Sequence, residues 1–220
     1  IHPHYGVFSP VRGEYVGLVA VAPLPALTDA HASFRAFEIG TGTGVLSAVL
    51  VRRGVGDVVA TDQDPRALAC AQENLARLGV AGPVHLVKTD LFPDGQANLI
   101  VCNPPWLPAR ASSPIEHAVY DEDSRMLLGF LRGLTAHLAP GGEGWLIMSD
   151  LAEHLGLRSP DMLAQAIDAA GLQVLGRIDA RPVHPKAGDA SDPLHAARSL
   201  EVTSLWRLAP YKNTRAGLSL

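Results

Sequence analysis

Few cysteines, few aromatic residues and no long apolar run limit what this chain of 220 residues can be. The two cysteines, Cys70 and Cys102, are too few for a disulfide framework or a cysteine-rich metal cluster. The nine histidines are scattered without a metal-binding spacing, so we predict no metal site. A membrane span needs about 18 or more consecutive apolar residues, and the sequence contains no such run.

A strong excess of one charge is also missing. The chain has 18 basic and 22 acidic residues, a formal net charge of −4, which gives no general case for binding nucleic acid. Only from Arg177 onward do basic residues outnumber acidic ones, and we interpret this end as solvated surface, with contact to a polyanion as the alternative. The first ten residues lack the basic and then apolar pattern of a signal peptide. The sequence therefore predicts a cytoplasmic protein with no membrane partner, and it leaves the oligomeric state undetermined.

What the chain does contain is an alternation of strand-like and helix-like segments. Helical spacing of apolar residues predicts helices over residues 45–53, 65–79 and 123–138. Between them, short continuously apolar segments, typical of strands buried on both faces, occupy residues 35–39, 58–61, 84–88, 97–102 and 144–149. The pattern predicts an α/β fold: a Rossmann-like, seven-stranded, mostly parallel sheet with helices on both faces.

The last part of the chain changes character. Residues 172–179 and 200–209 are strand-like, and a loop rich in Pro, Asp and Ala, from Arg181 to Ala197, separates them without a predicted helix. We expect a hairpin that closes the sheet edge with an antiparallel C-terminal strand. One domain is predicted over residues 31–210, with an N-terminal segment, 1–30, before it and a tail, 211–220, after it.

Three glycines lie between the first predicted strand and the first predicted helix, in FEIGTGTGVLSAVL. Gly40, Gly42 and Gly44 permit a tight turn, so that a ligand can meet free amides at the helix N-terminus. A nicotinamide-binding fold is the alternative, but its spacing is G-x-G-x-x-G rather than G-x-G-x-G. Glu38 stands two residues before the first glycine, and a carboxylate there disfavours a pyrophosphate and favours a cationic ligand.

Two more acids follow the next strands. Asp62 ends the second predicted strand, where an acid commonly accepts the hydroxyls of a ribose, whereas Asp64 is better placed to cap the helix that starts at Pro65. Asp90 follows the third predicted strand and can accept from the exocyclic amine of an adenine; the alternative is that it only ends the strand. Because these acids and the glycines meet at one edge of a parallel sheet, they predict a site for a positively charged nucleoside without phosphates.

The fourth predicted strand ends in the unusual sequence VCNPPWLP. The two prolines fix two φ angles and remove two backbone donors, so the chain there is stiff and extended. The side-chain oxygen of Asn103 and the carbonyl of Pro104 can then accept from an NH2 group, and Trp106 offers a face to a planar group. A plain proline-rich turn is the alternative. With the acids and glycines in the same chain, we interpret the segment as a rigid site for an NH2 group.

The ordered motifs Gly40–Gly44, Asp62, Asp90 and Asn103–Trp106 resemble those of class I S-adenosylmethionine-dependent methyltransferases. Within them the chain is similar to the N-P-P-[YFW] small-domain type, which includes the release-factor glutamine N5-methyltransferases and typically carries N-P-P-Y. The segment FSPVRGEYVGLV also resembles the one that precedes the glycine loop in those enzymes. The resemblance implies that Asn103, Pro104 and Trp106 are catalytic. It implies S-adenosylmethionine as cofactor, bound by Glu38, Gly40, Thr41, Gly42, Gly44, Asp62, Gln63, Asp90, Leu91 and Asn103.

The predicted function is methylation of a planar amide or amine nitrogen. A protein glutamine side chain is the first choice of acceptor, so the expected partner is a protein with an exposed Gln. The alternative partner is nucleic acid, with adenine N6 or guanine N2 of RNA or DNA as the acceptor and Trp106 stacking on the base. A small-molecule acceptor stays open, and a nicotinamide-binding oxidoreductase is a less favoured alternative.

The polar segment after the proline motif, residues 109–125, is expected to border the substrate entrance. Glu116, His117, Tyr120 and Asp121 are its candidates for shaping the acceptor pocket. Alternatively, the acids that start at Asp121 simply begin the next helix, where negative charge suits the helix dipole.

Overall fold

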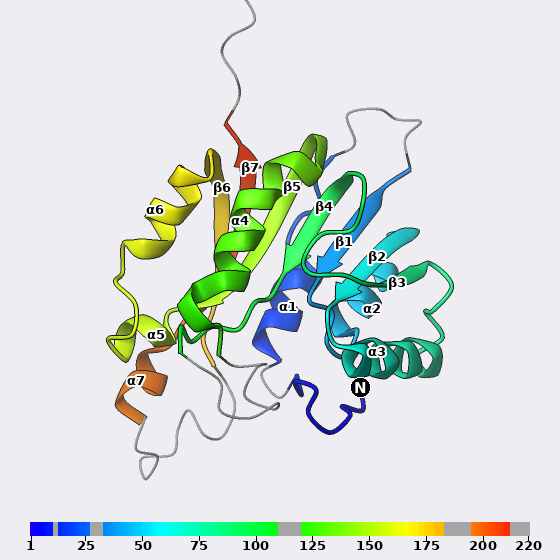
Figure 1. Ribbon diagram of the computed structural model, residues 1–220, viewed down its shortest axis with the longest axis horizontal. Coiled ribbons are helices and arrows are strands. Elements are labelled where there is room, and N and C mark those ends of the chain that lie inside the picture. The colour runs from blue at the N-terminus through cyan, green and yellow to red at the C-terminus, as the bar shows by residue number, and fades with distance from the viewer. Residues whose placement is uncertain (11–12, 27–32, 110–119, 183–194, 212–220) are drawn as a thin grey trace, which may run out of the picture.

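A computed structural model of the chain describes residues 1–10, 13–26, 33–109, 120–182 and 195–211. Seven strands form one sheet with helices packed on both of its faces (Figure 1). The strands are β1 (Arg35–Ile39), β2 (Asp57–Asp62), β3 (Val84–Lys88), β4 (Ala97–Cys102), β5 (Leu138–Ser149), β6 (Leu172–Ala180) and β7 (Thr203–Pro210).

The strand order is β3-β2-β1-β4-β5-β7-β6. The first five strands pair in parallel, and β7 runs antiparallel between β5 and β6. The predicted fold class, a mostly parallel seven-stranded sheet with an antiparallel C-terminal strand, is therefore confirmed. The order reverses between β1 and β4, so the loops that follow these two strands diverge and leave a crevice at their carboxyl ends.

The helices are α1 (Glu14–Val21), α2 (Val45–Arg52), α3 (Pro65–Arg77), α4 (Arg125–His137), α5 (Leu151–His154), α6 (Met162–Ala169) and α7 (His195–Leu200), with a 3-10 turn η2 (Glu122–Ser124) before α4. The start of α3 follows its sequence signals, since the carboxylate of Asp64 accepts from the amide of Arg66 at 2.9 Å and Pro65 takes the first position. Among the described residues, every helix falls short of the length and apolarity that crossing a membrane requires.

The connection between β6 and β7 corrects one expectation. The sequence predicted no helix there, but α7 occupies residues 195–200, and β7 begins at Thr203 rather than near Leu200. The helix-forming stretch HAARSL is only six residues long, too short to show a helical period. The same reason explains why α5, with four residues, was not anticipated.

The core lies on both faces of the central strands. Alternate residues of β1 and β4 enter opposite clusters, because successive side chains of a strand point to opposite faces. Phe37 and Ile100 pack in the cluster that holds Phe130 of α4, whereas Leu99 packs with Leu50 of α2 in the other. The strands are consequently apolar along their whole length, as the sequence indicated.

Two glycines of α4 let the loop after β3 approach this helix closely. A Cβ on Gly133 would lie 2.4 Å from Cε2 of Phe92, and a Cβ on Gly129 would lie 2.6 Å from Cδ1 of Leu91. Both distances are far below van der Waals contact, so only glycine fits at these positions. Since Leu91 also lines the cavity described below, α4 fixes one wall of that cavity through its glycines.

Gly133→Ala is expected to lower the free energy of unfolding. Alanine gains up to about 1 kcal/mol of helix propensity over glycine, but overpacking against Phe92 costs about 1 to 3 kcal/mol. Gly17→Ala in α1 is the matched control, because its added Cβ meets no atom within 4 Å and only the propensity gain remains. Urea unfolding of both variants should give opposite signs; a stabilised Gly133→Ala would contradict the packing described.

Candidate active site

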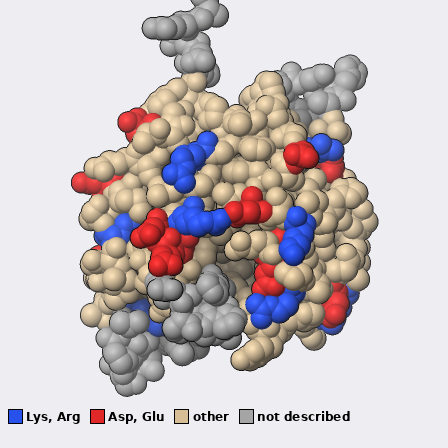
Figure 2. Space-filling model, in the orientation of Figure 1, with Lys and Arg blue, Asp and Glu red and all other residues tan. Residues whose placement is uncertain are grey.

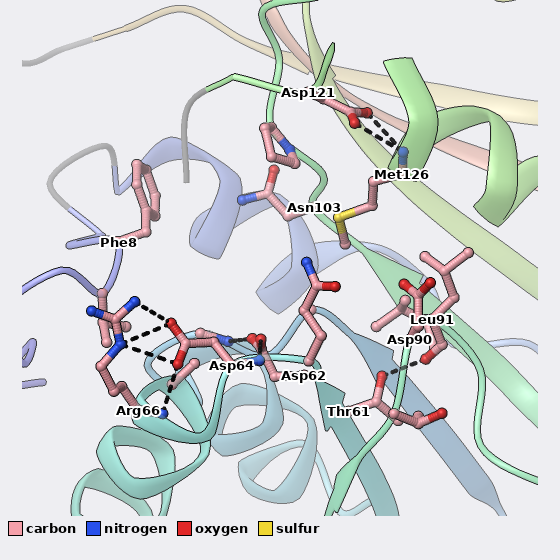
Figure 3. Close-up of a pocket in the computed structure, with 18 of the residues that line it drawn as sticks. Phe8, Thr61, Asp62, Asp64, Arg66, Asp90, Leu91, Asn103, Asp121 and Met126 are labelled. Carbon is pink, nitrogen blue, oxygen red and sulfur yellow. Dashed lines mark hydrogen bonds and ion pairs between the residues drawn. The ribbon is translucent and has the colours of Figure 1, made fainter. Parts of the chain in front are cut away.

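A cavity of about 720 Å³ opens where β1, β2, β3 and β4 end. Figure 3 shows Asp62, Asp90 and Asn103 around it, each from the end of a different strand. The remaining wall comes from the N-terminal residues and from the start of α4. A second, smaller cavity adjoins the first, and the two share four lining residues: Phe8, Gly40, Gly42 and Asn103.

The three glycines of the first loop have different structural roles, although all have positive φ, from 53° to 77°. A Cβ on Gly42 would meet no atom within 4 Å, and Gly42 lines both cavities, so its backbone is open to a ligand. At Gly40 a Cβ would lie 2.5 Å from Cε of Met126, so this glycine admits a side chain of α4. Gly44 lines neither cavity and packs against Ala71 of α3, which leaves it a packing role in this structure.

Glu38 ties the glycine loop to the helix that follows it. Its Oε2 accepts from the amide of Ser47 at 2.9 Å, from Oγ1 of Thr41 at 2.8 Å and from the hydroxyl of Ser47. Burial raises the pKa of Glu38 to about 7, although these hydrogen bonds favour the ionised form. Glu38 and Thr41 line only the smaller cavity, and the hydroxyl of Thr41 is directed at Glu38.

Asp62 stands at the rim of the large cavity with both carboxylate oxygens partly engaged. Oδ2 accepts from the amide of Gly42 at 3.0 Å, and Oδ1 accepts from the amide of Asp64 at 2.9 Å. Each oxygen keeps capacity for one further hydrogen bond, which is what a pair of ribose hydroxyls would need. Burial raises the pKa of Asp62, while the backbone hydrogen bonds act in the opposite direction. The adjacent Gln63 also lines the cavity.

Asp90 and Leu91 form the far wall of the cavity. Asp90 is exposed and forms an ion pair with Arg125 at the start of α4. Leu91 has a φ of 67°, unusual for a residue with a side chain, and its carbonyl accepts from the hydroxyl of Thr61 at 2.7 Å. That bond holds the loop after β3 against the end of β2, so both candidates face the same space as Asp62.

The proline motif lies across the cavity from Asp62 and Asp90. Asn103 and Pro105 line the large cavity, while Pro104 is buried. Trp106 lines neither cavity: its ring packs against both core clusters, and its Nε1 donates to Oδ1 of Asn103 at 3.0 Å. The structure thus brings Asn103 to the cavity, but it turns the Trp106 side chain toward Asn103 and the core.

The N-terminal residues contribute a wall that sequence reasoning did not assign. The amide of His2 donates to Oδ1 of Asn74, and the amide of His4 lies 3.3 Å from Sγ of Cys70, both in α3. This attachment places Phe8 at the cavity, where Figure 3 shows its ring facing Asn103. Phe8 is the first residue of the segment FSPVRGEYVGLV, whose resemblance to the family was noted above. That resemblance concerned the start of α1 and did not point to a role for Phe8 itself.

Asp121 serves as the cap of α4. Its carboxylate accepts from the amide of Met126 at 2.9 and 3.0 Å and from the amide of Leu127 at 3.1 Å (Figure 3). The alternative for the acids at the end of the polar segment therefore holds for Asp121, which precedes α4 and caps it, and Tyr120 and Asp121 also line the cavity. Glu116 and His117, the other two candidates of that segment, lie outside the described residues.

Comparison with known sequences supports the same family as the motifs. The model of the family described as methyltransferase small domain matches residues 1–169. The release factor glutamine methyltransferase of Cereibacter sphaeroides is 32% identical over 188 residues, 77% of this chain and 63% of that protein. The ribosomal protein L11 methyltransferase of Pelotomaculum thermopropionicum is 34% identical over 143 residues, 64% of this chain and 39% of that protein. The chain thus spans less than two thirds of either relative.

Solved structures agree on the fold. The ribosomal protein L11 methylase from Lactobacillus delbrueckii subsp. bulgaricus has a TM-score of 0.59 at 19% identity, covering 92% of this chain and 80% of that one. A methyltransferase from Geobacter sulfurreducens, solved with S-adenosyl-L-homocysteine, has a TM-score of 0.54 at 17% identity, covering 96% and 93%. Because both sequence identities are below 20%, these structures support the fold of this chain and nothing about its activity.

Glu38→Gln should change how stability depends on pH. Because burial raises the pKa of Glu38 to about 7 from 4.5, the folded protein holds this proton more tightly than the unfolded chain does. The resulting stability is present below about pH 4.5 and is lost as the pH rises through 7. Urea unfolding at pH 5 and at about pH 8 should therefore show that the free energy of unfolding falls more in the wild type than in Glu38→Gln as the pH rises. Other groups titrate in both proteins, so the difference between the two reports on Glu38. If the difference in stability between the two proteins were the same at both pH values, Glu38 would not titrate in this range.

Proposed function

This chain belongs to the methyltransferase small domain family, and from that premise we propose that it transfers a methyl group from S-adenosylmethionine to a planar nitrogen. The observation that carries the proposal is that Asp62 and Asn103, from the two halves of the sheet, line one cavity. This arrangement combines the nucleoside side of a cofactor site with the predicted NH2 site. The resemblance of the motifs to this family is confirmed by the match over residues 1–169.

The residues of the large cavity fit S-adenosylmethionine. Gly42 presents open backbone, and Asp62 keeps one acceptor position on each oxygen for ribose hydroxyls. Asp90 and Gln63 supply further polar groups at the strand ends. The acids of the site suit a ligand that carries a positive charge rather than phosphates. We therefore assign cofactor binding to this cavity. Glu38 and Gly44 contribute indirectly: Glu38 holds the shape of the glycine loop, and Gly44 lets the start of α2 pack on α3.

The chemistry requires an oriented nitrogen more than an acid or a base. S-adenosylmethionine, when bound, supplies a methyl group on a cationic sulfur, which keeps the electron pair of the broken bond as the nitrogen lone pair forms the new one. Asn103 and the carbonyl of Pro104 hold the NH2 group by accepting its hydrogen bonds. Their stiffness limits the ordering entropy lost on binding. The nitrogen becomes acidic only as it gains the methyl, so its proton can leave to water afterwards.

A protein glutamine amide is the acceptor we propose, and the partner is therefore a protein with an exposed Gln. Support comes from the relative named as a release factor glutamine methyltransferase, which covers 77% of this chain. The charge around the cavity offers no comparable support for nucleic acid. Figure 2 shows basic and acidic side chains intermixed around the hollow on this face, without a continuous basic stripe among the residues that are described.

The acceptor class can be tested by transfer of a radiolabelled methyl group to a bacterial lysate. We expect protein-bound label that protease releases and nuclease does not, and acid hydrolysis of the labelled protein should liberate methylamine from N5-methylglutamine. Label that follows nuclease digestion would instead establish the exocyclic-amine alternative. Asn103→Ala protein, which lacks the proposed acceptor oxygen, is the blank for non-enzymatic labelling.

Asp62 and Asn103 should show reciprocal defects. Asp62→Ala is expected to weaken S-adenosylhomocysteine binding by about 1 to 3 kcal/mol, the cost of leaving buried partners unsatisfied. Asn103→Ala should abolish turnover and leave that affinity within a few-fold. Asp179→Ala is the control for Asp62, because Asp179 pairs with Arg177 in β6 and lines neither cavity, so its loss should spare affinity. Calorimetric titration and methyl transfer measure the two effects; unchanged affinity in Asp62→Ala would remove it from the ribose site.

A further inference from the structure

The side chain of Trp106 is placed to act on Asn103 rather than on a substrate. Its Nε1 donates to Oδ1 of Asn103 at 3.0 Å, and its ring packs against both core clusters. An indole N–H is a donor only, so the atom of the carboxamide that faces it must be the oxygen. The hydrogen bond therefore removes the usual ambiguity in the orientation of an Asn side chain.

Asn103 has few other restraints at its carboxamide. Among the described residues, its NH2 group makes no hydrogen bond, and Figure 3 shows the nitrogen end directed toward Phe8 across the cavity. Without the indole N–H, the terminal torsion of an Asn side chain is broad and nearly two-fold, so oxygen and nitrogen can exchange places. Such an exchange would present the wrong set of hydrogen-bonding groups to an incoming NH2.

We propose that Trp106 is a positioning residue that fixes the polarity of the Asn103 carboxamide through its indole N–H, an inference that rests on the proposed function. With one oxygen lone pair taken by the indole, Asn103 offers the cavity one remaining lone pair and two N–H donors. That set is complementary to a group with an NH2 and an acceptor side by side, as in a primary carboxamide. A phenylalanine at position 106 has no donor, and the phenol of a tyrosine carries its donor at a different point, so this interaction belongs to the N-P-P-W form of the motif.

The hydrogen bond itself can be tested without any enzyme activity. The chain contains three tryptophans, so its ¹⁵N-labelled protein gives three indole N–H signals in an NMR spectrum. Asn103→Ala removes the acceptor and should shift the Trp106 signal and speed its exchange with solvent, while the signals of Trp145 and Trp206 stay in place. Asn103→Asp, which keeps an oxygen acceptor, should retain slow exchange. An unchanged Trp106 signal in Asn103→Ala would overturn the proposal.

The positioning role is tested by kinetics of Trp106→Phe, which keeps an aromatic ring and removes the donor. We expect kcat to fall about three- to tenfold, as for the loss of one hydrogen bond, with the affinity for S-adenosylhomocysteine unchanged within about twofold. Trp206→Phe is the matched control, since Trp206 is a half-buried indole that packs under Arg177 and lines neither cavity. It should leave kcat unchanged.

Other outcomes distinguish a failure of the positioning role of Trp106 from a failure of the proposed methyltransferase function. A wild-type kcat in Trp106→Phe would overturn the positioning role, and so would a joint loss of turnover and cofactor affinity, which would mean a general packing role. If wild-type protein transferred no methyl group to any acceptor class, the proposed function would fail. The indole signals would still report whether Trp106 holds Asn103.

Discussion

The buried carboxylate of Glu38 is the interaction on which the rest of the site depends. It accepts from three donors, one from Thr41 in the turn after β1 and two from Ser47 in the first turn of α2, at the cost of burying a group that prefers water. The hydrogen bonds offset that cost only in part, and the raised pKa of Glu38 reflects the remainder. These bonds fasten the glycine loop to α2, and the amide of Gly42 in that loop donates to Asp62 at the end of the neighbouring strand β2.

The opposite side of the cavity is held by different means. Two prolines stiffen the chain after β4, and the indole of Trp106 anchors the Asn103 side chain to the core. On the side of Asp62 and Asp90, the loop after β3 is held by glycines of α4 that admit Leu91 and Phe92. The Asp62 side and the Asn103 side of the cavity are thus held by separate contacts, so a substitution on one side need not disturb the other. Such rigidity matters for methyl transfer, because the reacting atoms must be aligned before the bond forms.

The family has room for different acceptors on one scaffold, and this chain illustrates where the variation can lie. Its relatives include proteins named for release factor and for ribosomal protein L11 methylation. On the proposed function, the fold and the Asp62 side of the cavity would serve any such acceptor. On the proposed function, Phe8 of the N-terminal wall and the carboxamide of Asn103, which both line the cavity, would meet the acceptor. Differences in acceptor choice are therefore expected from these two places rather than from the sheet.

The sequence by itself determined the fold class, the seven strands, the helices α2, α3 and α4 between the first five of them, and the positions of Asp62, Asp90 and Asn103 at strand ends. These features follow from local rules: apolar periodicity, glycine and proline geometry, and the fact that parallel strands end at one edge. Only the tertiary structure decided that Gly44 packs on α3, that Glu38 serves the loop, and that Trp106 turns to Asn103. It also brought Phe8 to the cavity and placed α7 between β6 and β7. The contacts of Phe8 and Gly44 join residues far apart in the chain, and α7 is too short to show a helical period. Glu38 and Trp106 bond to near neighbours in the chain, but the direction of a side chain depends on the packing around it, which no local pattern encodes.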